Sequence, residues 1–199
     1  MDQDTINAHI EAFLKSLQEL KVSEKTIQYI RSHRKLTQVK SKDTLILPGE
    51  ICKHIYVVLV GGFVCRYVHP KSGEAKTINF YLDDLHPVMA CLDSYFTQTP
   101  TNCELKAIAD SVVIAMPKSH VDVLREEDNL FEKYYYGIVS MAMREENELK
   151  TKLIAYSSKE KYAFILEEMP SVIQRVPSKY IAEFCGISPE WLSKLKKQG

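Results

Sequence analysis

The segment PSKYIAEFCGISPEWLSKLKKQ, near the C-terminal end, holds the residues whose types and spacing most clearly suggest a chemistry. It predicts a short helix over residues 178–185 and then a tight turn at Gly186, where a left-handed backbone is cheap. Ser188 can cap a second helix that begins at Pro189. This spacing is typical of a helix-turn-helix, whose second helix enters the major groove of DNA. An ordinary helical hairpin inside a core is the alternative.

Two sets of side chains in this segment are candidate DNA contacts. The candidates for base edges are Ser188, Glu190, Ser193 and Lys194. Glu190 could accept a hydrogen bond from a cytosine amino group. The candidates for phosphate groups are Ser178, Lys179, Lys196 and Lys197. Lysines at such positions give contacts that weaken as the salt concentration rises.

The charge of the chain is uneven although its sum is zero. The 199 residues carry 26 Lys and Arg and 26 Asp and Glu, which excludes a uniformly basic nucleic-acid coat and a uniformly acidic disordered chain. Residues 119–150 hold eight acids and four bases, whereas residues 171–199 hold five bases and two acids. The basic end therefore coincides with the predicted helix-turn-helix.

Cysteine and histidine spacing argues against a metal centre. The five cysteines contain no C-x-x-C pair and the six histidines no H-x-H pair, so we expect small buried thiols and scattered histidines. The sequence has no phosphate-binding loop and no nucleophile elbow, and we therefore expect no enzyme and no metal. His86 is the one histidine that we retain as a candidate ligand contact.

The elements that must position these residues change in character along the chain. Helical spacing over residues 1–40 gives way to short strands and turns over residues 41–117, as in a jelly roll. Helical spacing returns over residues 118–152 and continues to the end. We predict an α+β protein with a sensor domain over 1–117, a long helix over 118–152 and a DNA-binding domain over 153–199.

The long helix and the apolar stretches bear on assembly and location. A helix with a wide apolar face at residues 118–152 predicts a dimer seam, with a core helix inside one subunit as the alternative. The longest apolar stretch has 11 residues, against about 20 for a membrane span, and the N-terminus has no signal pattern. We expect a cytoplasmic homodimer that makes no membrane contact.

The chain resembles the Crp/Fnr family of bacterial transcription regulators. The resemblance rests on LILPGEICKHIYVVLVGGFVCRYVHPKSGEAKTINFYLDD in the strand-rich part and on ISPEWLSKLKK near the end. It implies a cyclic-nucleotide-binding-like β-roll, a dimerisation helix that lines an effector pocket, and a C-terminal helix-turn-helix. The chain stops four residues after Leu195, so we expect the family's β wing to be reduced or absent.

Departures from the family pattern concern the ligand. The stretch DDLHPVMACLDSYFTQTPTNCELKAIAD lacks the Gly and the Arg that a cyclic phosphate requires, and the family's Arg-Ser pair falls on Thr101 and Asn102. No cysteine precedes Cys52 to hold an iron–sulfur cluster. We expect no cofactor and an effector other than cyclic AMP. The candidate ligand contacts are His86, Met89, Thr101, Asn102 and Tyr135.

The sequence thus predicts a dimeric regulator on a palindromic DNA site, with half-sites about 34 Å apart. RNA polymerase is a further expected partner. A ligand-binding module that acts through protein contacts without DNA is the competing hypothesis. An enzyme on a jelly-roll scaffold, which would need a bound metal, is the third.

Overall fold

The computed structural model describes residues 3–196, and its strands form two antiparallel sheets. The strands are, in chain order, β1 (Lys35–Val39), β2 (Thr44–Ile46), β3 (His54–Val60), β4 (Gly62–Val68), β5 (Ala75–Leu82), β6 (Val88–Met89), β7 (Cys103–Ala107) and β8 (Ser111–Pro117). One sheet has the order β1-β8-β3-β6 and the other β2-β7-β4-β5. The two sheets enclose a core of apolar side chains, so the predicted jelly roll is confirmed.

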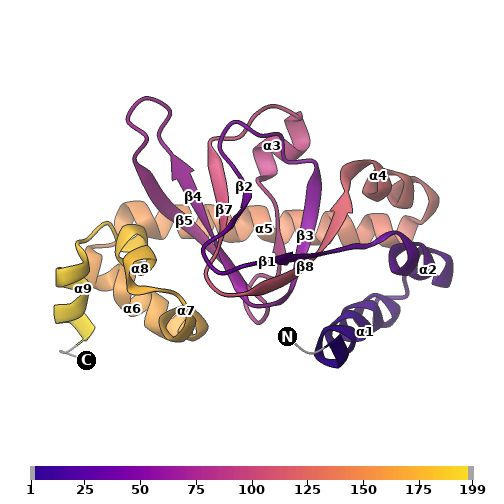
Figure 1. Cartoon of the computed structure of the whole chain (residues 1–199), viewed down its shortest axis with the longest axis horizontal. Helices are drawn as coiled ribbons and strands as arrows, with labels where there is room; N and C mark the ends of the chain where they lie inside the picture. Colours follow the sequence, from indigo (N-terminus) through magenta and orange to yellow (C-terminus); the bar gives the residue numbers. More distant parts are fainter. Residues whose placement is uncertain (1–2, 197–199) are drawn as a thin grey trace.

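The helices lie at both ends of this roll and along it (Figure 1). They are α1 (Gln3–Glu19), α2 (Glu24–His33), α3 (Leu92–Thr97), α4 (Lys118–Glu127), α5 (Asn129–Ala155), α6 (Ser158–Glu168), α7 (Pro170–Arg175), α8 (Ser178–Cys185) and α9 (Pro189–Lys196). α1 and α2 sit at one end, α6 to α9 sit at the other, and the 27-residue α5 runs behind the roll between them. None of the helices of residues 3–196 is long and apolar enough to cross a membrane.

The turn between β3 and β4 depends on a glycine. Gly61 has φ +89°, a conformation that residues with a side chain rarely adopt. A Cβ atom there would lie 2.9 Å from the carbonyl oxygen of Asp110 and would also collide with the Ser111 hydroxyl. The turn can therefore press against the start of β8 only because position 61 has no side chain.

The helical start of the chain is shorter than predicted. Ile6, Ile10, Leu14 and Leu17 bury one face of α1, as their spacing indicates. The prediction of helix up to residue 40 is wrong at its end, because residues 35–39 form β1 and pair with β8. That pairing joins residues about 80 positions apart, which local spacing cannot reveal.

The single helix predicted over residues 118–152 is in fact two. Asp128 separates α4 from α5 with φ −136°, and its carboxylate caps α5 by accepting hydrogen bonds from the N–H groups of Leu130 and Phe131 at 2.9 and 3.1 Å. It also accepts from the Ser23 N–H at 3.0 Å and from the Thr26 hydroxyl at 2.7 Å. The break therefore pins the start of α5 to the start of α2.

The C-terminal helices share a core with the outer face of the second sheet. β4 alternates: Phe63 and Cys65 point between the sheets, whereas Val64 points outward. Val64, together with Phe80 and Leu82 of β5, packs against side chains of α6 to α9. As far as Lys196, the chain forms no strand after β8.

Candidate functional site

The helix-turn-helix forms as its sequence predicts. Gly186 ends α8 with φ +68°, and the Ile187 N–H donates to the Ala182 carbonyl at 3.0 Å, which closes the end of the helix. The Ser188 hydroxyl accepts from the Trp191 N–H at 3.2 Å and so caps α9. Leu192 is fully buried against α8, and the polar face of α9 remains in solvent.

The predicted DNA contacts lie mostly on exposed surface. The exposed ones are Ser178, Lys179, Ser188, Glu190, Ser193 and Lys194. Glu190, Ser193 and Lys194 share one face of α9, since they are three and four residues apart. The side chain of Lys196 and the whole of Lys197 lie outside the described residues. These DNA contacts stay predictions.

The Glu190 carboxylate is available as an acceptor. Hydrogen bonds from its own backbone N–H and from the Ser188 hydroxyl lower its pKa, so it is ionised at neutral pH. Lys179, the phosphate candidate on α8, holds its ammonium 4.5 Å from the centre of the Tyr180 ring. The face thus presents both charge signs, which suits selective contacts more than a uniform basic surface.

An ion-pair network fastens α8 to the second sheet. Arg66 of β4 donates from Nε and Nη2 to the two carboxylate oxygens of Glu183, each at 3.0 Å, and from Nη1 to Glu104 at 2.6 Å. The Thr77 hydroxyl also donates to Glu183, at 2.8 Å. Phe184, the next residue of α8, lies 4.9 Å from Phe80 between ring centres. The first helix of the motif therefore rests directly on the roll.

A second ion-pair cluster fastens the end of α7. Arg175 Nη1 donates to Asp83 at 2.6 Å and to Asp84 at 2.7 Å, and Nη2 donates to the Gly61 carbonyl at 2.8 Å. The Ser171 hydroxyl donates to Asp84 at 2.6 Å. Sequence reasoning missed both clusters, and the sole signal for the first was Glu183, an acid in a basic segment.

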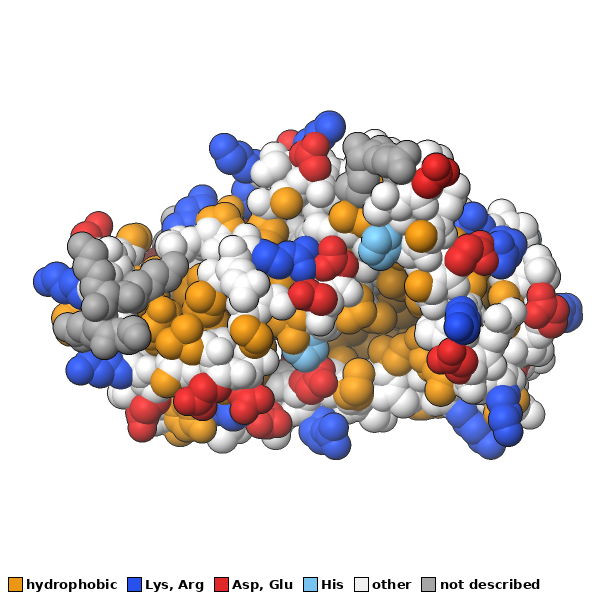
Figure 2. All heavy atoms as spheres, turned by 90° about the horizontal axis from the view of Figure 1, so that it is seen from below, with side chains coloured by type: hydrophobic (Ala, Val, Ile, Leu, Met, Phe, Trp, Pro, Cys, Tyr) orange, Lys and Arg blue, Asp and Glu red, His pale blue; other side chains and the backbone are white. Residues whose placement is uncertain are grey.

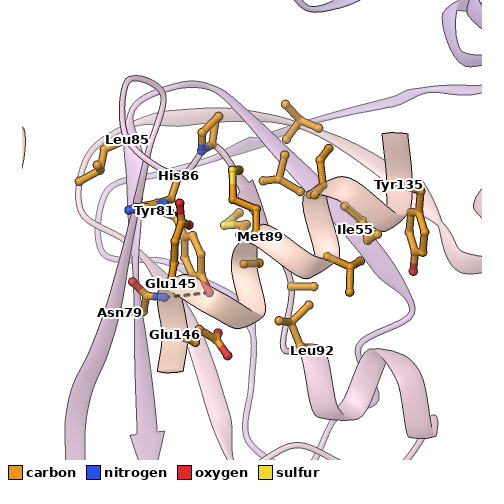
Figure 3. A pocket seen from close by; sticks show the side chains of 18 of the residues that line it. Ile55, Asn79, Tyr81, Leu85, His86, Met89, Leu92, Tyr135, Glu145 and Glu146 are labelled. Carbon is orange, nitrogen blue, oxygen red and sulfur yellow. Dashed lines mark hydrogen bonds and ion pairs between the residues drawn. The ribbon is translucent and has the colours of Figure 1, made fainter. Parts of the chain in front are cut away.

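A cavity of about 620 Å³ lies between the roll and α5. Figure 2 shows a hollow lined by apolar side chains, and Figure 3 shows its interior. Its walls come from α1, α2, the sheets, α5 and α6, with Ile55 and Met89 from the roll and Ile138 and Phe164 from the helices. The volume lies within the range of about 300–1,000 Å³ for small-molecule sites.

Polar groups gather at one end of this cavity. His86 Nδ1 lies 3.0 Å from Glu145, and Asn79 Nδ2 donates to the Tyr81 hydroxyl at 3.5 Å. Burial raises the pKa of Tyr81, so its hydroxyl keeps its proton. Glu146 lines the same end with a partly exposed side chain, and the desolvation of its inner part raises its pKa. The cavity combines an apolar body with a small polar end.

Three of the five predicted ligand contacts line the cavity and two do not. His86, Met89 and Tyr135 are lining residues. Thr101 is buried elsewhere, where its hydroxyl accepts from the Cys103 N–H at 3.0 Å, and Asn102 is exposed outside the cavity. The structure brings the first three together, and the ligand role of all five stays a prediction.

Sequence reasoning missed the cavity's acidic side chains. In the sequence, Glu145 and Glu146 are only two of the eight acids of residues 119–150. Their spacing from Tyr135 and Ala142, which also line the cavity, was the one signal of their position. The three successive tyrosines divide as helical geometry requires. Tyr134 and Tyr135 line the cavity, and Tyr136 is exposed on another face.

Solved structures share this fold at low sequence identity. FixK2 of Bradyrhizobium japonicum matches with a TM-score of 0.71 at 15% identity, over 83% of this chain and 83% of that one. A regulator assigned to the Crp/Fnr family in Eubacterium rectale matches with a TM-score of 0.68 at 15% identity, over 92% of this chain and 85% of that one. The c-di-GMP responsive regulator CLP of Xanthomonas campestris matches with a TM-score of 0.66 at 12% identity, over 88% and 91%.

Sequence comparison alone finds less. No protein-family model matches the chain, and no curated protein matches it. The structural matches nevertheless cover 83% and 92% of this chain. The chain therefore has the fold of the Crp/Fnr regulators, and the resemblance seen in its sequence is confirmed at the level of the fold.

Proposed function

We propose that the protein is a DNA-binding transcription regulator of the Crp/Fnr type, which acts as a homodimer and is controlled by a small molecule other than cyclic AMP. The observation that carries the proposal is the helix-turn-helix, in which α8 and Gly186 hold α9 with its polar face in solvent. We propose no catalytic activity. Contact with RNA polymerase and a cytoplasmic location stay predictions.

The outer face of α5 supports a homodimer. Tyr136, Met143 and Ile154 are 56%, 63% and 77% exposed. Met143 follows Tyr136 by 7 residues and Ile154 follows it by 18, which is close to two and to five whole helical turns. The three side chains therefore form one stripe along α5. Ile138, which lines the cavity, lies about 200° around the helix from Tyr136. A second copy can thus cover the stripe and leave the cavity in place.

Sedimentation velocity tests this seam. The combined change Met143→Glu and Ile154→Glu puts two charges on the stripe, and we expect it to convert a dimer into a monomer. Val123→Glu is the control, because it adds one charge of the same sign at an exposed apolar position on α4, away from the stripe. A double variant that sediments like the unchanged protein excludes this seam.

The proposed ligand control uses α5 as the moving part. One face of α5 lines the cavity, the opposite face carries the stripe, and its end leads into α6 and the C-terminal helices. A ligand that fills the cavity can bias α5 only if it binds one arrangement of the helix better than another. The readout is therefore DNA affinity with and without ligand.

Binding isotherms on selected DNA test the regulator directly. Duplexes enriched from a random pool by the protein are compared with scrambled duplexes at two salt concentrations. Lys194→Ala should weaken binding to the selected duplex, because Lys194 is a candidate contact to base edges. Glu190→Ala should reduce the preference for the selected duplex more than it reduces affinity for the scrambled one.

The control for these variants is Lys25→Ala, which removes an exposed lysine at the far end of the molecule. Unchanged isotherms for Lys194→Ala and Glu190→Ala remove these residues from the contact surface. Failure to enrich any duplex favours the alternative, a ligand-binding module that acts through protein contacts. The observation that supports this alternative is the attachment of α8 to the sheet by Arg66.

A further inference from the structure

We propose that the cavity between the roll and α5 binds an amphipathic organic cation, a primary amine on an aliphatic or aromatic body, whose ammonium group meets the Glu146 carboxylate. This inference rests on the proposed effector site and names its class of ligand. It follows from the charges that line the cavity and from which of them already have partners.

The body of the ligand must be apolar. The lining side chains distant from the polar end are aliphatic, aromatic or thioether groups, among them Val57, Met89, Met116 and Phe131. Such groups favour a hydrocarbon body, because removing apolar surface from water lowers the free energy. A sugar or a polyphosphate would leave its hydroxyl or phosphate groups without partners there.

The fixed charges of the lining are mostly negative. Four carboxylates line the cavity, and they belong to Glu145, Glu146, Glu148 and Glu168. Among the described residues that line the cavity, Lys152 is the sole lysine, and there is no arginine. A carboxylate or phosphate ligand would therefore meet repulsion from several sides, and an ammonium would meet attraction.

Partners inside the protein and position along the cavity together single out Glu146. Lys152 Nζ is bound to Glu148 at 2.6 Å, and Glu145 is bound to His86 at 3.0 Å. Neither Glu146 nor Glu168 makes a hydrogen bond or ion pair with a side chain of residues 3–196. Of these two, Glu146 lies at the end of the cavity where Asn79 and Tyr81 lie (Figure 3), and its charge is close enough to act on the Tyr81 hydroxyl.

The environment of Glu146 explains why a cation would bind there. The Glu146 side chain is partly exposed, and the part that meets the cavity wall is desolvated, which raises its pKa. An ammonium group bound beside it favours the ionised carboxylate. The Tyr81 hydroxyl oxygen offers a second acceptor, so a primary amine with three N–H donors suits the site better than a quaternary ammonium, which has none.

Three probes of equal size separate the classes of ligand. They are 4-phenylbutylamine, 4-phenylbutanol and 4-phenylbutanoate, which carry a positive, a neutral and a negative head on the same body. Titration calorimetry with the full chain at neutral pH should rank the amine first, about tenfold above the alcohol, because hydrogen bonds to a charged partner are the stronger ones. The carboxylate should bind most weakly.

Glu146→Gln tests the residue itself. It should reduce amine affinity about tenfold, to the level of the alcohol, and leave alcohol affinity unchanged. Glu167→Gln is the matched control, since this glutamate is exposed and does not line the cavity. The ranking of the three probes on the unchanged protein needs no variant, so a Glu146→Gln protein that fails to fold leaves that half of the test intact.

The outcomes distinguish this inference from the proposed function. A carboxylate that binds as well as the amine, or a Glu146→Gln protein with unchanged amine affinity, overturns the cation site while alcohol binding still supports the effector cavity. If none of the probes binds, the cation site and the effector cavity fall together. The DNA isotherms decide the regulator independently of both.

Discussion

Arg66→Ala is the substitution for which the structure gives the clearest magnitude. The Arg66 guanidinium holds Glu183 of α8 and Glu104 of β7, and these three side chains are 16%, 26% and 13% exposed. Removing one partner of a buried ion pair costs about 3–5 kcal/mol, because the other charge is left uncompensated. Since water reaches these groups in part, we expect the lower end, about 3 kcal/mol.

The expected change is large enough for ordinary denaturation experiments. A loss of about 3 kcal/mol lowers the melting temperature of a chain of this length by about 6–12 °C at a fixed protein concentration. A double-mutant cycle of Arg66→Ala and Glu183→Ala isolates the pair itself. Its coupling energy should be about 2 kcal/mol, within the range for directly contacting residues.

An exposed ion pair serves as the control. Lys25 lies 2.7 Å from Glu127, and these side chains are 80% and 50% exposed. Lys25→Ala should lower the melting temperature far less than Arg66→Ala does, because exposed ion pairs contribute little to stability. If Arg66→Ala costs no more than Lys25→Ala, or if the cycle shows coupling below about 0.5 kcal/mol, then α8 is not held to the roll by this network.

Three further predictions concern the break before α5, the turn of the motif and the thiols. Burial opposes the ionisation of Asp128, but hydrogen bonds from α2 and α5 lower its pKa below the ordinary 3.8. The stabilisation by the ionised carboxylate is therefore fully present above the ordinary pKa, and it is lost as the pH falls through the lowered pKa of the folded state. Asp128→Asn should therefore cost about 1–2 kcal/mol at pH 7 and progressively less between about pH 5 and pH 2, and melting curves that differ equally at both ends would contradict this. Gly186→Ala should cost about 1 kcal/mol in urea denaturation and Gly186→Asn less, because the left-handed backbone is the only obstacle there and asparagine tolerates it; equal costs would refute the argument. Cys103 should react with N-ethylmaleimide before the other thiols, since it is half-buried and a hydrogen bond from the Cys65 thiol lowers its pKa, whereas burial raises the pKa of Cys185 to about 11; peptide mass spectrometry that finds Cys185 labelled first would disprove it.

The elements governed by local signals could be predicted from the sequence. Gly61 and Gly186 mark turns because few other residues adopt a positive φ, and the strands and helices between such turns follow from their spacing. The helix-turn-helix was predictable almost to the residue for this reason. Every signal it needs lies within about 20 residues.

Features that depend on distant partners could not be predicted. The helix break at Asp128 is set by Ser23 and Thr26, more than 100 residues away, while the apolar spacing runs on through the break. Arg66 and Glu183 are 117 residues apart. In the same way, Glu146 became a candidate only when the packing of α5 showed which of its faces meets the cavity.

The common core of the roll and the C-terminal helices limits how this protein can be shortened. Val64, Phe80 and Leu82 of the second sheet are fully buried, and they contribute to the same cluster as side chains of α6 to α9. A gene truncated after α5 would leave these side chains in water, at a cost of about 1.5–3 kcal/mol each. A shortened chain would therefore have to keep these four helices as a cover, or carry polar residues on that face of the sheet.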